Sequence, residues 1–274
     1  MNPETYTKSP DAFLRDARLP VRVMKSEDDM MREIASIMFE TIANNGENPT
    51  VIICPVGPVN QYPYFADMVN KARLSLKNCT FINMDEYVDA HGNAIPYDDP
   101  LSFHAIMDRM LYDRIDPALI MPKAQRLFPE PGREKEIDAL IDSLGKVDCV
   151  LTGVGINGHI AFNEPPSEEE FDSDDAFAAC GTRILPISAE TRVNNGANKL
   201  RGALDLFPPK CITLGMRQLL KAKRFKVYLY CPWQWGIMRK AALEAPSRFT
   251  PVSFLQNHPD AEMVVTEDLL GFML

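Results

Sequence analysis

Residues 153–164 read GVGINGHIAFNE and directly follow the apolar run VDCVLT at 147–152. The apolar run indicates a buried strand. The glycines after it predict a sharp turn whose backbone can approach a ligand closely; they are Gly153, Gly155 and Gly158. Ligands of open α/β sheets bind at the carboxyl ends of the strands. We therefore interpret His159, followed by Glu164, as a proton-transferring imidazole with a carboxylate partner.

Strand-length apolar segments alternate with helical periodicity along the rest of the chain. We predict further strands at 50–54, 79–83, 211–215, 226–231 and 262–266. We predict helices from Ser26 onward and at 64–76, 102–114, 133–144, 217–222 and 235–244. This alternation indicates an α/β fold with three layers, in which helices cover both faces of a mostly parallel sheet. We expect residues 1–25 to form an irregular N-terminal arm and residues 26–274 to form a single domain.

The composition excludes several classes of partner. A formal net charge of −9 argues against a nucleic-acid surface and against binding to anionic membranes. No apolar run approaches the roughly 18 residues that span a bilayer, and the polar start of the chain lacks the apolar core of a signal peptide. We therefore expect a cytoplasmic protein. The 6 cysteines include no CxxC pair, which indicates reduced thiols rather than disulfides or a zinc site.

A second polar segment, NMDEYV at 83–88, follows the strand predicted at 79–83. Asp85 and Glu86 should therefore lie at the same sheet edge as His159. Because adjacent side chains near a strand end point to opposite sides, we expect one of the two carboxylates to enter the pocket. A carboxylate and an imidazole together suit proton transfer next to a carbonyl group.

Other catalytic motifs do not occur in the sequence. There is no GxSxG elbow, which argues against a serine hydrolase, and no Walker A motif is present. The glycines of GVGING at 153–158 have the spacing of a G-x-G-x-x-G motif, but His159 and Phe162, which follow them, do not suit the start of a phosphate-binding helix. With 4 histidines and no H-E-x-x-H motif, we expect no metal at Asp85, His159 and Glu164.

Three segments resemble, in order, the motifs of the glucosamine-6-phosphate deaminase/isomerase family. They are NMDEY at 83–87, GVGINGHIAFNEP at 153–165 and SFLQNHP at 253–259, and the resemblance extends over about residues 30–270. It implies a Rossmann-like fold related to 6-phosphogluconolactonase. It also implies a reaction without a cofactor, in which an aminosugar phosphate ring opens, isomerises and releases ammonia.

The resemblance also implies a role for each catalytic residue. Asp85 would move a proton between C2 and C1, His159 would assist ring opening, and Glu164 would orient His159. Asn157 stands where many family members carry aspartate. An amide can still hydrogen-bond to the imidazole but supplies no charge, so the imidazolium form would be less favoured.

The phosphate-binding residues that the resemblance leads one to expect are replaced. The family has a Ser/Thr-Gly-Gly-Ser/Thr loop after its first strand, whereas this chain has PVGPVN at 55–60. Gly57 is kept, but valines replace the hydroxyl residues, and Pro58 has no backbone donor. The usual lysine falls near Trp235, and the usual arginine falls near Ala197.

Two explanations fit this loss. In the first, the far end of the sugar carries no phosphate: Asn60 and Gln61 bond its hydroxyls, and Trp233 and Trp235 stack on its face. In the second, Lys199, Arg201 or Arg192 rebuild a phosphate site. Alternatively, both indoles have a purely structural role and pack against the helix that follows them. The candidate substrate-binding residues are Gly57, Asn60, Glu86, Gly155, Gly158, Arg192, Lys199 and Trp235.

The sequence therefore favours an aldose–ketose isomerase that deaminates an aminosugar phosphate or a related sugar. Two alternatives stay open. One is a lactone hydrolase in which His159 activates water, and the other is a non-catalytic sugar-sensing protein. The expected partner is a small sugar or sugar phosphate, and association into a homo-oligomer is left open.

Overall fold

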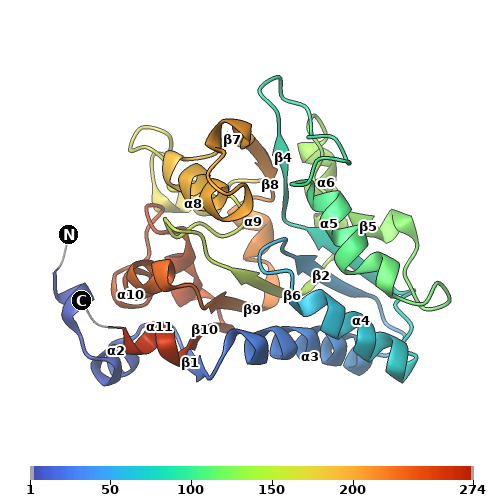
Figure 1. Ribbon diagram of the computed structural model, residues 1–274, viewed down its shortest axis with the longest axis horizontal. Coiled ribbons are helices and arrows are strands. Elements are labelled where there is room, and N and C mark those ends of the chain that lie inside the picture. The colour runs from blue at the N-terminus through green and yellow to red at the C-terminus, as the bar shows by residue number, and fades with distance from the viewer. Residues whose placement is uncertain (1–2, 273–274) are drawn as a thin grey trace.

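A seven-stranded parallel sheet forms the centre of the molecule (Figure 1). The computed structural model describes residues 3–272. In spatial order the strands are β1 (Val21–Met24), β10 (Ala261–Thr266), β9 (Ala222–Leu229), β6 (Val147–Gly153), β2 (Thr50–Cys54), β3 (Cys79–Asn83) and β5 (Arg126–Leu127). Every neighbouring pair in this sheet is parallel. The predicted mostly parallel α/β fold is confirmed.

Helices cover both faces of this sheet. Successive residues of each strand point to opposite faces, so every strand contributes side chains to a hydrophobic core on each side. In β2, Val51 and Ile53 enter one hydrophobic core, whereas Ile52 and Cys54 enter the other. The core around Ile52 includes α3 (Glu27–Asn45), α4 (Gln61–Ala72) and α5 (Phe103–Met110). The core around Val51 includes α2 (Pro10–Asp16), α6 (Glu134–Leu144), α9 (Met216–Leu219), α10 (Trp235–Leu243) and α11 (Glu267–Gly271). The molecule therefore has the three predicted layers.

The helix predicted from Ser26 shows how local sequence sets an element. The Ser26 hydroxyl accepts a hydrogen bond of 3.2 Å from the Asp29 amide, which satisfies one unpaired donor at the start of α3. Three acidic residues in the first turn complement the positive end of the helix dipole. The remaining helical elements are α1 (Glu4–Thr7), α7 (Asp174–Ala178), α8 (Ala189–Lys199), η1 (Tyr112–Arg114), η2 (Lys123–Gln125), η3 (Leu204–Leu206), η4 (Pro232–Gln234) and η5 (Pro251–Asn257).

The expectation of an irregular arm over residues 1–25 is wrong for its described part; residues 1–2 lie outside the described residues. This part forms α1, α2 and β1. Strand β1 extends the central sheet, with Val21 paired to Met263 of β10. Its four residues are all half-buried, so no run of apolar residues marks the strand in the sequence. Its partner also lies at the opposite end of the chain.

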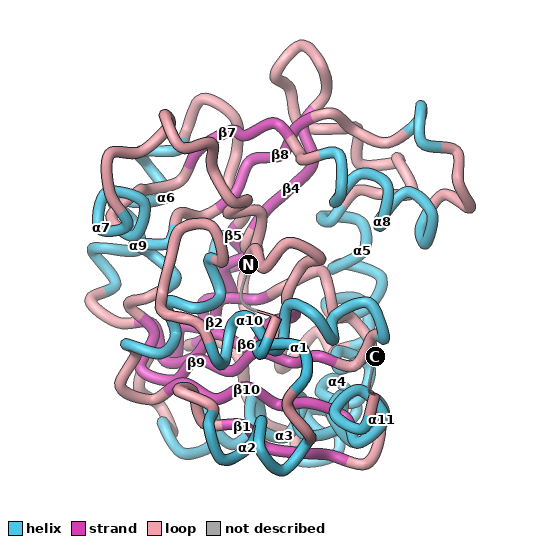
Figure 2. Tube along the Cα trace, turned by 90° about the vertical axis from the view of Figure 1, so that its left-hand side faces the viewer, coloured by secondary structure: helices cyan, strands magenta, loops and turns pink. Residues whose placement is uncertain are grey.

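A small antiparallel sheet lies at one end of the central sheet (Figure 2). Its order is β4 (Asp85–Val88), β8 (Lys210–Thr213) and β7 (Arg183–Pro186). The strand predicted at 211–215 belongs to this sheet rather than to the parallel one, because it pairs in antiparallel register with β4 and β7. Only Met84 separates β3 from β4, so Asp85 stands at the junction of the two sheets.

Within residues 3–272, none of the helices has both the length and the apolar character needed to cross a membrane.

Candidate active site

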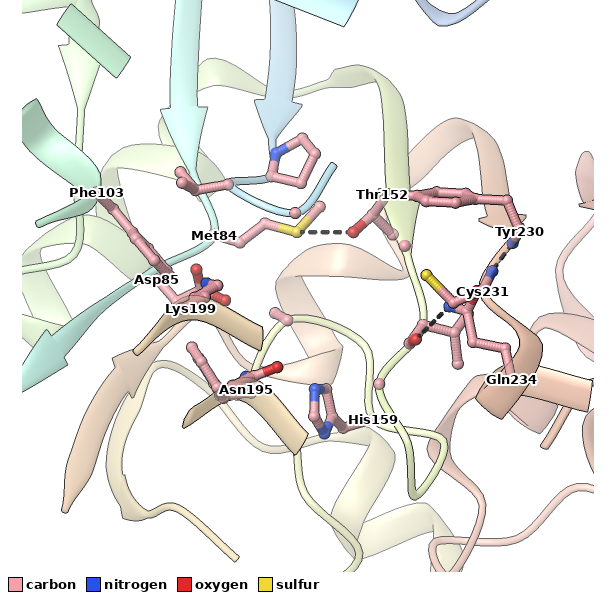
Figure 3. A pocket seen from close by; sticks show the side chains of 18 of the residues that line it. Met84, Asp85, Phe103, Thr152, His159, Asn195, Lys199, Tyr230, Cys231 and Gln234 are labelled. Carbon is pink, nitrogen blue, oxygen red and sulfur yellow. Dashed lines mark hydrogen bonds between the residues drawn. The ribbon is translucent and has the colours of Figure 1, made fainter. Parts of the chain in front are cut away.

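A cavity of about 170 Å³ lies where β3, β2, β6 and β9 end (Figure 3). These four strands are neighbours in the parallel sheet, so the loops that follow them meet at one edge. The volume is below the range of about 300–1,000 Å³ typical of pockets for drug-sized ligands. The residues that line the cavity include Val56, Gly57, Asp85, Gly155, His159, Asn195, Lys199, Tyr230, Cys231, Trp233 and Gln234.

Asp85 brings a carboxyl group into this cavity at the start of β4. The side chain is buried, with only 6% of the residue exposed. Burial and the neighbouring charge of Glu86 raise the pKa of Asp85 to about 8, while the charge of Lys199 opposes the rise. A carboxyl group with a pKa close to neutral can both accept and return a proton.

Glu86 does not line the cavity, although it was a candidate substrate-binding residue. It is fully buried, and its carboxylate accepts hydrogen bonds from the amides of Phe103 (2.9 Å) and His104 (3.1 Å) at the start of α5. The Nδ1 atom of His104 lies 2.9 Å from the same carboxylate. Asp85 enters the cavity and Glu86 caps a helix, as the alternation of side chains in a strand requires. This structural task explains why Glu86 faces away from the substrate space.

The imidazole of His159 is held through its Nδ1 atom. This atom lies 2.8 Å from Oδ1 of Asn157 and 3.3 Å from Oε2 of Glu164. The Nδ2 group of Asn157 in turn donates to Glu164 and, at 3.2 Å, to the hydroxyl of Ser188. Thr191 approaches the same Nδ1 at 3.5 Å. Across residues 3–272, the ring's hydrogen bonds all involve Nδ1, which leaves Nε2 for a ligand in the cavity.

Glu164 remains negatively charged over the physiological pH range. Burial raises its pKa, but the charge of His159 and hydrogen bonds from His159, Asn157 and Thr191 outweigh burial and lower the pKa to about 2. The carboxylate therefore supplies the negative charge beside the imidazole that the amide of Asn157 cannot supply. Ser188 and Thr191 were not predicted as site residues, and no signal in the sequence separates them from ordinary helix-capping residues.

Two glycines of the turn have distinct structural tasks. A Cβ atom at Gly155 would overlap the imidazole of His159, so this position must lack a side chain. Gly158 has a φ of +90°, a conformation that side chains disfavour, and it does not line the cavity. Hydrogen bonds of 3.0 Å from the Gly155 amide to the His159 carbonyl and from the Gly158 amide to the Gly155 carbonyl close the turn. Gly158 therefore shapes the turn, and Gly155 makes room for the ring.

Helix α8 contributes Lys199 and Asn195 to the cavity. Much of the Lys199 residue is exposed, but its amine is directed inward. Its Nζ lies 3.4 Å from the hydroxyl of Tyr87 and 5.2 Å from the centre of the Phe103 ring. Desolvation lowers the pKa of Lys199, while the charges of Asp85 and Glu86 oppose this effect. Asn195 was not predicted. Its position four residues before Lys199 places it on the same helix face, and this spacing could have identified it.

Three other predicted residues lie outside the cavity, namely Asn60, Arg192 and Trp235. Asn60 precedes α4. Trp235 is 6% exposed and packs between Tyr6 and Phe272, and its Nε1 donates to the Phe272 carbonyl at 2.8 Å. The structure therefore places Trp235 in the core, and of the two indoles it is Trp233 that lines the cavity. Gly57 lines the cavity as predicted.

The Trp235→Ala variant is expected to lose about 3–5 kcal/mol of unfolding free energy, because a buried indole is removed from the core. Its KM for the substrate should stay close to that of the unmodified protein. Trp233→Ala is the matched variant, for which we expect the opposite pattern of raised KM and a smaller loss of stability. Urea unfolding and steady-state kinetics measure both quantities. A raised KM with unchanged stability for Trp235→Ala would contradict the placement of Trp235.

Within the described part of the chain, no cluster of three or more His, Cys, Asp and Glu residues is arranged to hold a metal ion. The 6 cysteines are all free thiols, and 4 of them are buried.

Proteins of known activity share this architecture. No protein-family model matches the chain. The structure resembles a monomeric glucosamine-6-phosphate deaminase with a TM-score of 0.78 and 25% identity, over 92% of this chain and 98% of that one. It also resembles the 6-phosphogluconolactonase of Trypanosoma brucei, with a TM-score of 0.62 and 16% identity over 92% of this chain and 98% of that one. At that identity, the second likeness shows the fold alone.

Sequence relatives agree with the structural comparison. The glucosamine-6-phosphate deaminase of Bacillus velezensis is 28% identical over 251 residues, which cover 89% of this chain and 95% of that protein. The glucosamine-6-phosphate deaminase of Serratia proteamaculans is 31% identical over 230 residues, which cover 81% of this chain and 79% of that protein. On this identity and coverage, the chain belongs to the glucosamine-6-phosphate deaminase family.

Proposed function

We propose that this protein converts an aminosugar, of the glucosamine-6-phosphate type or a related sugar, into a ketose with release of ammonia. One observation carries the proposal. A buried carboxyl group with a pKa near 8 and an imidazole anchored at Nδ1 by a carboxylate and an amide face the same cavity. The relatives at 28–31% identity are named for this reaction.

His159 opens the sugar ring in this mechanism. Its Nε2 takes the proton of the C1 hydroxyl and delivers a proton to the ring oxygen, which gives the open-chain aldehyde. Asn157 accepts the Nδ1 hydrogen and fixes the orientation of the ring. The charge of Glu164 stabilises the imidazolium that forms while the proton is carried.

Asp85 then performs the isomerisation. Its carboxylate removes the proton from C2 while a proton of the substrate's ammonium group passes to O1, which leaves an enolamine with a hydroxyl group at C1. The resulting carboxylic acid then returns the first proton to C1. The nitrogen now forms an iminium group at C2. Addition of water to C2 and departure of ammonia complete the conversion to the ketose. Each step uses only the substrate, water and these side chains.

The direct test measures ammonia release and ketose formation by the purified protein with glucosamine-6-phosphate and with glucosamine. We expect stoichiometric amounts of both products from at least one of these sugars. A folded protein that releases no ammonia from either sugar but hydrolyses a gluconolactone would reject this function and establish lactone hydrolysis instead.

The pH dependence of kcat/KM should follow the ionisation of Asp85. Its folded-state pKa of about 8 lies above the usual 3.8 of an aspartate, so the active carboxylate becomes protonated as the pH falls below 8. We expect kcat/KM to fall about tenfold per pH unit below this midpoint. Glu86→Gln removes the neighbouring like charge and should move the midpoint to lower pH. Asp67→Asn, which changes an exposed carboxylate on α4, should leave it unchanged. An identical midpoint in Glu86→Gln would contradict the assigned cause.

A further inference from the structure

The cavity has two chemically different ends, set by the order of the strands. Asp85 follows β3, and Lys199 lies on the same wall, close enough for the two charges to interact (Figure 3). The segment after β9 forms the opposite wall with Tyr230, Cys231 and Gln234. If the proposed function holds, C1 and C2 of the sugar lie beside Asp85. The far end of the sugar then extends toward the β9 wall and the loop after β2.

The far end carries no positive side chain among the described residues that line the cavity. Its lining consists of Pro55, Val56, Gly57, Tyr230, Cys231, Trp233 and Gln234. Among residues 3–272, Lys199 is the one basic residue besides His159 that lines any part of the cavity. Its amine lies near the Tyr87 hydroxyl on β4, at the Asp85 end. Lys199 is therefore placed to interact with the reacting end of the sugar and not with its far end.

Several hydrogen-bond donors at the far end already have protein partners. The amides of Tyr230 and Cys231 donate to Oε1 of Gln234 at 2.8 and 2.9 Å. The Gln234 amide donates to the Cys231 carbonyl at 2.8 Å, and its side-chain Nε2 donates to the Val154 carbonyl at 2.7 Å. By contrast, the backbone amides of Val56 and Gly57 donate no hydrogen bond within the described residues. A group bound here thus meets aromatic faces, paired polar atoms on the wall after β9, and uncharged amide donors in the loop after β2.

A phosphate monoester fits this end poorly. It carries a charge of about −1.5 to −2 near neutral pH. Burying such a charge away from water is unfavourable unless a cation accompanies it, because charge-assisted hydrogen bonds to positive side chains are the strongest replacement for its hydration. Tyr230 and Trp233 instead offer apolar ring faces with a polar edge, which suit the C–H surface and hydroxyl of an uncharged sugar end.

We propose that the substrate is an aminosugar without a phosphate, whose far end is a neutral hydroxymethyl group. This inference deepens the proposed function and rests on it for the orientation of the sugar. It separates this chain from its relatives, whose names specify a 6-phosphate substrate.

The first test compares kcat/KM for ammonia release from glucosamine and from glucosamine-6-phosphate. We expect the free sugar to be preferred by about tenfold or more, and inorganic phosphate not to compete with it. A preference for the phosphate ester, or competitive inhibition by inorganic phosphate, would overturn the proposal.

A binding measurement separates failure of this proposal from failure of the proposed function. Calorimetry with the Asp85→Asn variant compares the affinities of both sugars without turnover. The asparagine carries no negative charge that could repel a phosphate at any pH, so tighter binding of glucosamine in this variant supports a neutral far end even if no sugar releases ammonia. Tighter binding of glucosamine-6-phosphate rejects the neutral end while leaving deamination intact.

Adding a positive charge at the far end provides a gain-of-function test. Trp233→Arg places a guanidinium in this wall, and it should raise the affinity for glucosamine-6-phosphate relative to glucosamine by about tenfold. Val193→Arg adds the same charge at an exposed position of α8 and should leave this ratio unchanged. Equal shifts in both variants, or no shift in Trp233→Arg, would count against the assignment of the far end.

Discussion

Asp85→Asn is expected to lower kcat for ammonia release by about 10²–10⁴-fold, the range typical for loss of a general base. The amide cannot accept the C2 proton, so the C2-to-C1 transfer stops. The fold should be unaffected for a specific reason. With a pKa of about 8, Asp85 is mostly uncharged at pH 7, and asparagine has the same shape and charge.

The control for this variant is Asp67→Asn, which removes an exposed carboxylate outside the cavity. It should retain full kcat. Circular dichroism and urea unfolding verify that both variants fold as the unmodified protein does. Retention of more than a tenth of the original kcat in Asp85→Asn would exclude this carboxylate as the base.

Gly155→Ala should inactivate the protein almost as thoroughly, although it adds only one methyl group. The new Cβ would overlap the imidazole of His159. Unlike Gly158, Gly155 does not have a positive φ, so its backbone accepts an alanine without strain. The imidazole must therefore turn away from the cavity and give up its 2.8 Å contact with Asn157. We expect kcat to fall about 10²-fold or more through loss of the general acid and base.

Gly236→Ala is the matched control because a Cβ there meets only an ordinary contact with Tyr6, at 3.9 Å. It lies in α10, and alanine should stabilise that helix slightly. Steady-state kinetics and thermal unfolding of both variants provide the comparison. A Gly155→Ala protein with unchanged kcat would show that His159 does not act from its observed position.

The elements predicted best are those marked by continuous apolar runs. Residues 50–54 and 79–83 form β2 and β3 with the bounds expected from the sequence. These strands are buried on both faces of a parallel sheet, so most of their residues are apolar. The prediction that the glycine turn and the NMDEY segment lie close together was also correct. Both segments follow parallel strands, and the carboxyl ends of parallel strands meet at one edge of the sheet.

Two strands of the small antiparallel sheet, β4 and β7, gave no comparable signal, whereas β8 was predicted as a strand but was assigned to the parallel sheet. Strand β4 begins with the charged residues Asp85 and Glu86, which are more typical of loops than of strands. Strand β7 ends at Pro186, a residue that is uncommon within strands. The two indoles show a second limit. Trp233 and Trp235 are two residues apart at the change from η4 to α10, and the rotation between those elements sends one into the cavity and the other into the core. Sequence spacing alone does not specify that rotation.

The pairing of β1 with β10 joins segments from opposite ends of the chain, with Val21 beside Met263. A ribosome makes β1 long before it makes β10. Until β10 has been made, β1 has no strand of this sheet to pair with, and β9 presents an open edge. Strand β1 can therefore join the sheet only after β10 has been made. Removal of the first 24 residues would leave β10 as an exposed edge, open to strands from other molecules.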